Sequence, residues 1–226
     1  MLNILLADAE LEMVPESIAS HPSVVVNARK RGKKTVNILL DASLHHAAMR
    51  NLEMGERRGR PDIVHFSLLL ALDSILNQIG KLRIYVHTRN NELIVVDPQT
   101  RLPRNYPRFV GLIESLFNNK VVPSREMPLL TLIEGYDFGK CLDNIPHSKV
   151  IVFSQTGRNV ILSAYLEKMQ DENLLCVIGG FPEGDFLSNV YELADDVISI
   201  APQTLSVWTV ISELIVNYEN VHLPSR

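Results

Sequence analysis

The chain has 226 residues, of which 46% are hydrophobic and 21% charged, with a formal net charge of −4. This is the composition of an ordinary globular protein with ample sequence for a hydrophobic core, which argues against a disordered or mostly membrane-buried chain. Cys141 and Cys176 stand far apart and form no CxxC pair, which argues against a zinc site or a disulfide framework and favours a reducing compartment.

Positive charge is concentrated in one sector of the sequence. Residues 29–108 contain 15 Lys and Arg against 7 Asp and Glu, whereas the rest of the chain contains 7 against 19. A basic sector on an acidic protein predicts a localised site for a polyanion, although a chance excess of solvated cations would give the same count. The run RKRGKKT, from residue 29, is expected to be a flexible basic loop.

Neither a secretory leader nor a membrane span is expected. The first residues, MLNILLADAELEMV, become acidic too soon for a signal peptide. The longest apolar stretch, IVHFSLLLALDSIL, contains a His and an Asp and is too short to cross a bilayer. We therefore expect a cytoplasmic protein with no membrane partner.

Short apolar runs alternate along the chain with helical patterns. The alternation predicts an α/β fold in which helices flank a mostly parallel sheet. No element is expected in the polar, proline-bearing segment 118–148. The predicted strands are residues 36–40, a hairpin of 82–88 and 92–96, and 149–153, 174–178 and 196–200. The predicted helices are residues 62–79, a helix that follows Pro107, and 204–219.

Two loops follow predicted strands of the carboxyl-terminal half. GGFPEGDF comes directly after strand 174–178, and APQTLS comes directly after strand 196–200. Open parallel sheets bind ligands beyond the carboxyl ends of their strands, so these loops are candidates for holding a nucleoside through main-chain groups. Their spacing matches neither the dinucleotide fingerprint GxGxxG nor a phosphate loop GxxxxGK[ST]. The glycines could equally serve only to make a turn.

An Arg–Asp pair stands at the start of the first long helical pattern, RRGRPDIVHFSLL. Arg60 and Asp62 flank a proline, so the carboxylate can orient the guanidinium for planar recognition. The alternative is an Asp at a helix amino terminus beside surface arginines.

Three more arginines precede a helix, in RLPRNYPRF. Arg101, Arg104 and Arg108 lie at a helix amino terminus, the wrong end for cations because the helix dipole is positive there. An external polyanion such as a phosphodiester backbone would explain them.

A possible acid–base pair follows strand 36–40 in the segment LDASLHHAAM. Asp41 and His45 stand four residues apart, a spacing at which they could share a proton. His45 and His46 are adjacent and therefore point to different faces, so a metal site is disfavoured. Ser43 lacks the glycines of a nucleophile elbow, which disfavours a hydrolase triad.

Several segments, taken together and in order, resemble one family. They are LLDASLHHAAM, RGRPDIVHFSLLLALDSILN, GKLRIYVHTRNNELIVV, RLPRNYPRFVGLIESL, IGGFPEGDF and ISIAPQTLSVW. Over about residue 36 to the end, the sequence is similar to the archaeal branch of the SPOUT-superfamily Nep/EMG methyltransferases. These enzymes modify a pseudouridine of small-subunit ribosomal RNA at N1, and their eukaryotic members are ribosome assembly factors.

The resemblance implies a single SPOUT domain over residues 1–226, with RNA-binding elements in about 29–110 and a cofactor site in about 149–226. It implies a deep carboxyl-terminal trefoil knot, which periodicity alone does not reveal. It also implies S-adenosylmethionine as cofactor, S-adenosylhomocysteine as product, no metal, and a homodimer that binds ribosomal RNA and works alongside other small-subunit assembly proteins. The implied cofactor contacts are Ser154, Gly179, Gly180, Gly184, Ser199, Ile200, Ala201, Pro202, Gln203, Thr204 and Leu205.

The expected activity is S-adenosylmethionine-dependent N1-methylation of a pseudouridine in small-subunit ribosomal RNA. By resemblance, Arg60, Arg101, Arg104 and Arg108 contact RNA, and Asp62 holds Arg60. Asp62 and Asp41 are the candidate catalytic carboxylates. The proposed role of Asp41 comes from the residues alone, because eukaryotic members differ at DASLHH. The alternatives are a non-catalytic RNA-binding assembly factor, or a SPOUT methyltransferase that acts on another RNA.

Overall fold

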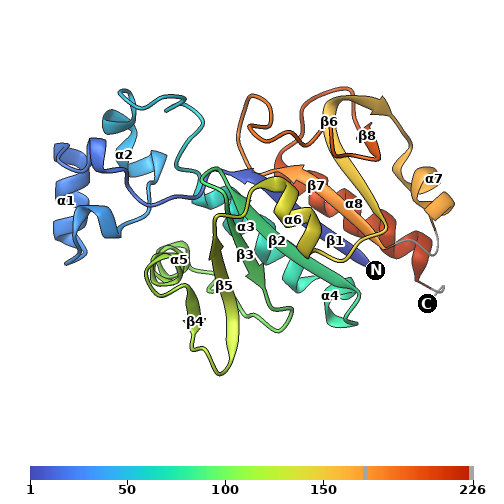
Figure 1. The fold of residues 1–226 in the computed structure, drawn as a ribbon, viewed down its shortest axis with the longest axis horizontal. Coiled ribbons are helices and arrows are strands. Elements are labelled where there is room, and N and C mark those ends of the chain that lie inside the picture. The colour runs from blue at the N-terminus through green and yellow to red at the C-terminus, as the bar shows by residue number, and fades with distance from the viewer. Residues whose placement is uncertain (170–172, 224–226) are drawn as a thin grey trace.

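A mixed sheet runs through the centre of the molecule, with helices on both of its faces (Figure 1). The computed structural model describes residues 1–169 and 173–223. Within these residues the sheet has eight strands in the order β4-β5-β3-β2-β1-β7-β6-β8. The strands are β1 (Leu2–Ala9), β2 (Leu82–Thr88), β3 (Glu92–Val96), β4 (Val121–Pro123), β5 (Pro128–Glu134), β6 (Lys149–Asn159), β7 (Leu174–Gly179) and β8 (Asp196–Ser199).

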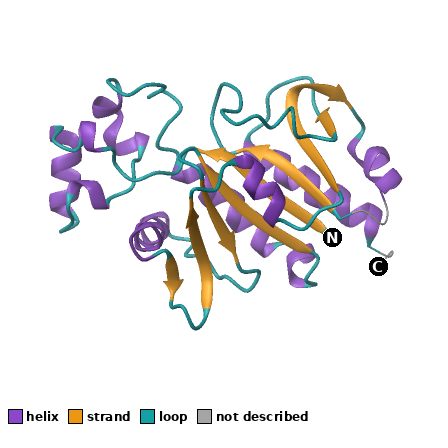
Figure 2. Ribbon diagram, in the orientation of Figure 1, coloured by secondary structure: helices purple, strands orange, loops and turns teal. Residues whose placement is uncertain are grey.

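Helices surround the sheet and also form a separate group at one end of the molecule (Figure 2). The α-helices are α1 (Pro22–Lys30), α2 (Ala42–Met49), α3 (Pro61–Asp73), α4 (Ile75–Gln78), α5 (Tyr106–Asn119), α6 (Phe138–Asn144), α7 (Leu162–Leu166) and α8 (Val207–His222). Short 3-10 helices are η1 (Glu16–Ile18), η2 (Thr35–Asn37) and η3 (Glu167–Met169). Among the described residues, no helix is long and apolar enough to cross a membrane.

The parallel part of the sheet consists of β2, β1, β7, β6 and β8. Strands β3, β5 and β4 extend it on one side in antiparallel pairing. The prediction of an α/β fold with a mostly parallel sheet is therefore confirmed, as is the hairpin of β2 and β3. Because parallel strands end at the same edge, the loops that follow β7 and β8 meet there, beside the point where the pairing of β6 with β8 shifts.

Strand β1 lies in the middle of the sheet, and the sequence analysis assigned no element to it. All eight of its residues are buried. Leu2, Ile4 and Leu6 face the larger core, which α3, α5 and α8 cover, whereas Leu5 and Ala7 face the smaller core under α6. A strand covered on both faces has a mostly apolar sequence, and LNILLADA is apolar apart from the buried Asn3 and Asp8.

The predicted strand at residues 36–40 is wrong. Residues Thr35–Asn37 form the 3-10 helix η2, and Leu39 makes only an isolated bridge with Met13. Residues Ile38 and Leu40 are buried in a cluster beneath α1 and α2. A short apolar run reports burial, and periodicity alone does not say whether a strand or an irregular segment is buried.

Other elements differ from their predicted limits. The helix predicted at 62–79 is divided at Ser74, whose extended backbone ends α3 and whose side chain accepts the Asn77 N–H that starts α4. The segment 118–148 contains β4, β5 and α6, so it is not without structure. The last helix, predicted at 204–219, instead covers Val207–His222.

The basic run from residue 29 is not the free, flexible loop that was predicted. Its first residues end α1, and Arg31 and Lys33 reach the buried Glu114 of α5 at 2.5 and 2.6 Å. Glu114 also accepts the Leu39 N–H at 3.0 Å. These contacts anchor the helical module, residues 16–49, which lies at the blue end of the ribbon in Figure 1.

Candidate functional site

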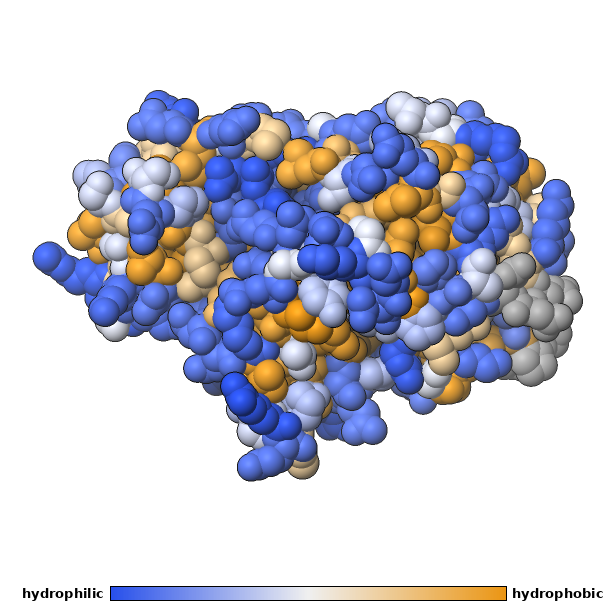
Figure 3. All heavy atoms as spheres, in the orientation of Figure 1, coloured by the Kyte–Doolittle hydropathy of each residue, from blue (hydrophilic) through white to orange (hydrophobic). Residues whose placement is uncertain are grey.

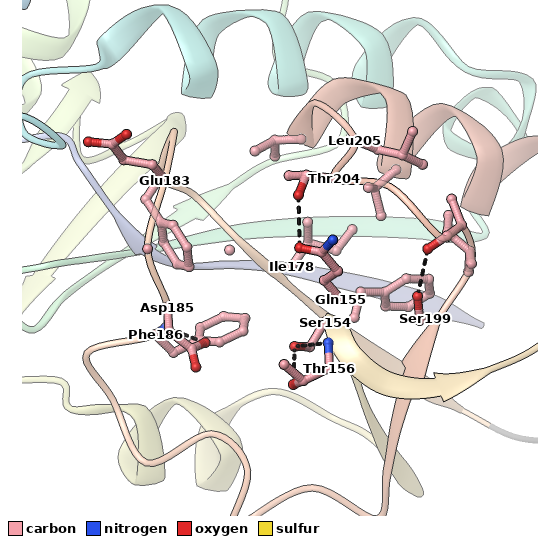
Figure 4. Close-up of a pocket in the computed structure, with 18 of the residues that line it drawn as sticks. Ser154, Gln155, Thr156, Ile178, Glu183, Asp185, Phe186, Ser199, Thr204 and Leu205 are labelled. Atoms are coloured by element: carbon pink, nitrogen blue, oxygen red, sulfur yellow. Dashed lines mark hydrogen bonds between the residues drawn. The ribbon is translucent and has the colours of Figure 1, made fainter.

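A cleft of about 500 Å³ opens between residues 153–156 of β6 and the loops that follow β7 and β8 (Figure 4). We call it the loop cleft. Of the residues expected to bind a cofactor, Gly180 and Pro202 are not part of its lining. The others line it, namely Ser154, Gly179, Gly184, Ser199, Ile200, Ala201, Gln203, Thr204 and Leu205.

Gly180 has a structural place beside the cleft. Its N–H donates to Ala7 O at 2.7 Å, and its carbonyl accepts the Glu10 N–H at 3.1 Å. These bonds attach the loop after β7 to the end of β1. The segment that begins at Gly180 therefore leaves the sheet in a fixed direction.

Apolar side chains form much of the cleft wall. Ile178 ends the buried run of β7, and Phe153 stands where β6 changes its pairing with β8. Val207 and Val210 come from the first turn of α8. Phe181, which the sequence analysis did not single out, completes the wall. Such a surface suits a planar aromatic group.

Polar groups also line the loop cleft and make hydrogen bonds with one another or with the main chain. Thr204 donates through its hydroxyl to Gln155 Oε1 at 2.8 Å, and Ser199 donates to Ala201 O at 2.9 Å. Both contacts are drawn in Figure 4. Gln155 and Thr156 were not predicted, although the polar SQT that follows the apolar run KVIVF is a signal for them.

A chain of hydroxyls leads to a carboxylate in the loop cleft. Tyr191 donates to Asp185 Oδ1 at 2.5 Å, and its oxygen lies 3.0 Å from Ser154 Oγ. Ser154 is in turn 2.9 Å from the Thr156 hydroxyl. Burial, together with the Asp185 carboxylate, raises the pKa of Tyr191. The phenol therefore stays protonated and keeps Asp185 in place.

A second cleft, of about 300 Å³, lies between the start of α3 and the start of α5. We call it the arginine cleft, because Arg60 and Arg104 both line it. Arg60 donates to both oxygens of Asp62, from Nε at 2.9 Å and from Nη2 at 2.8 Å. The Asp62 carboxylate raises the pKa of Arg60. The guanidinium is thereby held charged and in one orientation.

The remaining arginines of the expected RNA set are exposed. Arg101 and Arg104 precede α5, and Arg108 lies in its first turn, where Asn105 caps the helix. Within residues 1–169 and 173–223, the side chains of these three arginines have no carboxylate or hydrogen-bond partner. They therefore add unneutralised charge to a helix end that is already positive.

Asp41 also lines the arginine cleft, but it is not paired with His45 through its carboxylate. Its Oδ1 accepts the Ser43 N–H at 2.9 Å as the cap of α2, and its Oδ2 accepts the Tyr106 hydroxyl at 2.7 Å. His45 Nδ1 instead accepts the backbone N–H of Asp41 at 3.1 Å. Burial, with the Asp41 bond next, raises the pKa of Tyr106 far above its ordinary value. The prediction that Asp41 and His45 form an acid–base pair is therefore wrong, because the Asp41 carboxylate bonds to Ser43 and Tyr106 instead.

Other cations of the basic sector bind acidic residues inside the protein. Arg57 and Arg89 both reach Glu10, at 2.6 and 2.7 Å. Arg58 donates to both oxygens of Glu12 at 2.7 Å. The positive surface is consequently smaller than the sequence count indicates, and the arginine cleft with Arg101 and Arg108 beside it is one part of it. Within the described parts of the chain, no group of three or more His, Cys, Asp and Glu side chains is placed to hold a metal.

Comparison with known proteins places this geometry in a family. The EMG1/NEP1 methyltransferase family model matches residues 4–219. The chain belongs to that family. It is 58% identical over 220 residues to the ribosomal RNA small subunit methyltransferase Nep1 of Methanothrix thermoacetophila, with 97% of this chain and 96% of the relative covered. It is 49% identical over 219 residues to the Nep1 of Pyrococcus furiosus, with 96% of each covered.

A solved structure shares the fold of this methyltransferase. The crystal structure of Archaeoglobus fulgidus Nep1 bound to S-adenosylhomocysteine superimposes with a TM-score of 0.86. The two chains are 38% identical, and 97% of each is covered. The chain therefore has the fold of that methyltransferase, and the expected family is confirmed.

Proposed function

We propose that this enzyme uses S-adenosylmethionine to methylate N1 of a pseudouridine in small-subunit ribosomal RNA. The observation that carries the proposal is the loop cleft, which opens between the bend of β6 and the carboxyl ends of β7 and β8 in a chain similar to a protein solved with S-adenosylhomocysteine. The relatives are named as small-subunit ribosomal RNA methyltransferases. Their names give the RNA class, and the pseudouridine N1 target comes from the resemblance in sequence.

The loop cleft has the size and lining that the cofactor needs. Small-molecule pockets measure roughly 300–1,000 Å³, and this one is about 500 Å³. Ile178 and Val210 offer an apolar wall for the adenine, while the loops from residue 179 and residue 200 expose main-chain groups. When bound, S-adenosylmethionine supplies a methyl group on a positively charged sulfur. The protein's part is to fix that group against the target nitrogen, which can contribute on the order of 7–11 kcal/mol.

We assign RNA binding to the arginine cleft and to the arginines beside it. Arg60 is oriented by Asp62, and Arg101, Arg104 and Arg108 present exposed charge to phosphates. A base must leave its stack to reach a methyl donor, so we expect the target in an unpaired RNA loop.

The two candidate carboxylates receive different roles. Both oxygens of Asp62 accept hydrogen bonds from Arg60, so we assign Asp62 to positioning that guanidinium. Asp41 lines the cleft and holds the Tyr106 hydroxyl. We propose Asp41 with Tyr106 as the polar group nearest to an RNA base entering the arginine cleft.

We also propose that the enzyme is a homodimer. The outer faces of α3 and α8 form an apolar groove that includes Phe66, Trp208 and Val216. Phe66 is 54% exposed and Val216 is 49% exposed, and the Phe66 and Trp208 rings lie 5.6 Å apart. A second copy of the chain placed on this face would bury these side chains and bring its own arginines near the first copy.

Methyl transfer to defined RNAs tests the activity. Hairpin RNAs with either uridine or pseudouridine at one loop position are incubated with the protein and methyl-labelled S-adenosylmethionine. Label is expected only in the pseudouridine RNA, because uridine uses its N1 for the glycosidic bond. Equal label in both RNAs would eliminate the pseudouridine specificity.

A cofactor-cleft variant separates the enzyme from a pure assembly factor. Gly184 lines the loop cleft with φ of +83°, and a Cβ there would lie 3.2 Å from Arg57 Nη1, so Gly184→Arg should distort this wall of the cleft. Methylation should be lost, while RNA affinity measured without cofactor is kept. If small-subunit assembly in cells survives this variant, the binding role is the primary one.

A further inference from the structure

Arg57 connects the loop cleft to the arginine cleft although it lines neither of them. Its side chain is almost fully buried, with 5% of its surface exposed. Nε donates to Glu10 Oε1 at 2.6 Å, and Nη1 donates to the carbonyl oxygen of Asp185 at 2.8 Å. The guanidinium carbon lies 4.3 Å from the centre of the Phe181 ring. Asp185 and Phe181 both line the loop cleft.

These contacts add to the Tyr191–Asp185 hydrogen bond and the Phe181–Phe186 ring contact in fixing this loop. The segment from Phe181 to Asp185 makes a turn with no helix or strand in it. Arg57 contacts it at both ends, through the ring at one and the carbonyl at the other. A cation over an aromatic face and a charge-assisted hydrogen bond are each strong when water is excluded.

Glu10 links the same loop to Arg60, to which we assign RNA binding. The Glu10 N–H donates to Gly180 O at 3.1 Å, and the Arg60 N–H donates to Glu10 O at 2.8 Å. Its carboxylate holds Arg57, three residues before Arg60. Main chain and side chain of one residue thus join the loop after β7 to the loop that enters α3.

We propose that Arg57 is a positioning residue that fixes the 181–185 wall of the loop cleft and makes cofactor binding and RNA binding depend on each other. The inference deepens the proposed function and rests on it. A shift of the 181–185 loop on cofactor binding acts on Arg57 and so on Arg60. By linkage, RNA that fixes Arg60 must then favour the cofactor to the same extent.

Arg58 provides a matched control. It lies on the same segment and makes an ion pair of the same kind, with Glu12, but it does not contact the 181–185 loop. Arg57→Ala and Arg58→Ala each remove one arginine from a largely buried pair. Both should lower the thermal unfolding temperature. A difference in ligand affinity between them would therefore come from the contact of Arg57 with the 181–185 loop and not from lost stability.

Calorimetric titration with S-adenosylhomocysteine measures the first effect. Arg57→Ala should raise the Kd about tenfold, the cost of one charge-assisted hydrogen bond, whereas Arg58→Ala should leave it unchanged. KM for S-adenosylmethionine should rise in Arg57→Ala with little change in kcat. Arg57→Lys retains a cation for Glu10 but lacks the planar fork, so it should behave like Arg57→Ala and can replace it if the alanine variant does not fold. Equal Kd values for the Arg57 and Arg58 variants would overturn the proposal.

The interdependence is measured by titrating a pseudouridine hairpin with and without saturating S-adenosylhomocysteine. The wild-type protein and Arg58→Ala should show the same change in RNA Kd on adding the ligand, and Arg57→Ala should show none. The coupling would be overturned if Arg57→Ala showed the same change in RNA Kd as the wild type. It would also be overturned if the ligand did not change the RNA Kd of the wild type.

Hydrogen exchange separates this inference from the proposed function. Amides of residues 181–190 should exchange faster in Arg57→Ala than in Arg58→Ala, with no ligand present. If the wild type binds no S-adenosylhomocysteine, the proposed function fails while this difference still tests the positioning role. Equal exchange in the two variants would refute that role alone.

Discussion

Arg60 and Asp62 meet in a two-bond fork at the mouth of the arginine cleft, with 29% and 35% of their side chains exposed. Half-exposed ion pairs contribute roughly 0–1 kcal/mol to stability. Asp62→Asn should therefore change the urea unfolding free energy by less than about 1 kcal/mol. It should nevertheless weaken RNA binding several-fold, because the guanidinium loses its fixed orientation. RNA titration of the variant checks this, and unchanged affinity would separate the pair from recognition.

Buried histidines make stability depend on pH. His87 is fully buried beside Asp8, and burial lowers its pKa, as it does for His45. The unfolded chain thus binds protons more readily than the folded one, so stability is present above the unfolded pKa of about 6.5 and is lost as pH falls below it.

Urea unfolding at about pH 7.5, 6 and 5 should give a falling free energy. The variant His87→Gln should show a shallower fall, since one of the buried groups no longer titrates. If the unfolding free energy of His87→Gln fell with pH as steeply as that of the wild type, His87 would not contribute to the pH dependence.

Individual contacts of the site were predictable only when they are local in sequence. The spacing of Arg60 and Asp62 indicates their pairing, and the structure shows it. Asp41 meets Tyr106 from 65 residues away, and Arg57 meets Asp185 from 128 away. No local sequence pattern predicts these contacts, because residues so far apart in the chain are brought together only by the fold.

Gly157 lies where β6 bends around β8. Ile198 pairs with Phe153 before the bend and with Arg158 after it, so the two backbones pass closely. A Cβ on Gly157 would lie 2.6 Å from the backbone carbon of Ile198. Gly157→Ala should destabilise the protein by about 1–3 kcal/mol and weaken binding in the loop cleft, which shares this bend.

Gly111 in α5 gives the matched control. A Cβ there meets nothing within 4 Å, so Gly111→Ala should stabilise the protein by about 0.5–1 kcal/mol through helix propensity. Thermal unfolding of both variants compares them directly. Equal shifts in the same direction would show that the bend tolerates a side chain.

The carboxyl-terminal strands were predicted well, and the elements around β5 were not. Strands β7 and β8 have the short apolar runs of a buried parallel sheet. Strand β5 is half exposed and sits among prolines, so its alternation was weak. The extension of β6 to Asn159 depends on pairing with β8, which only the folded chain reveals.

Over the whole molecule, part of the positive charge in the sequence is neutralised by buried carboxylates, as Glu10 and Glu12 do for Arg57 and Arg58. The view in Figure 3 shows a largely hydrophilic face broken by smaller hydrophobic areas. Arg104 is exposed and belongs to the unneutralised group. Arg104→Ala should lower RNA affinity and reduce the slope of log K against log salt by about one unit.

The control is Arg58→Ala, since Arg58 is occupied by Glu12. Its salt slope should match that of the wild type. Binding curves at several salt concentrations provide the measurement, and equal slopes for Arg104→Ala and the wild type would exclude a phosphate contact.

The proposed dimer predicts a change of assembly state. Val216→Glu places a charge on the apolar face of α3 and α8. Sedimentation velocity should find a monomer for this variant and a dimer for the wild type. Val26→Glu, on the exposed side of α1, is the control that should leave the dimer intact. The trefoil knot and the single-domain organisation likewise stay predictions from resemblance.

Strand β1 also has a consequence for how the protein is made. Its partners β2 and β7 lie far apart in the chain, so the edge of this largely apolar strand that pairs with β7 stays unpaired until residues 174–179 have been synthesised. At about 5–20 residues per second that interval is on the order of ten seconds. During this interval the unpaired edge of β1 can pair with neighbouring nascent chains. Assistance from chaperones should therefore matter most just before β7 emerges from the exit tunnel.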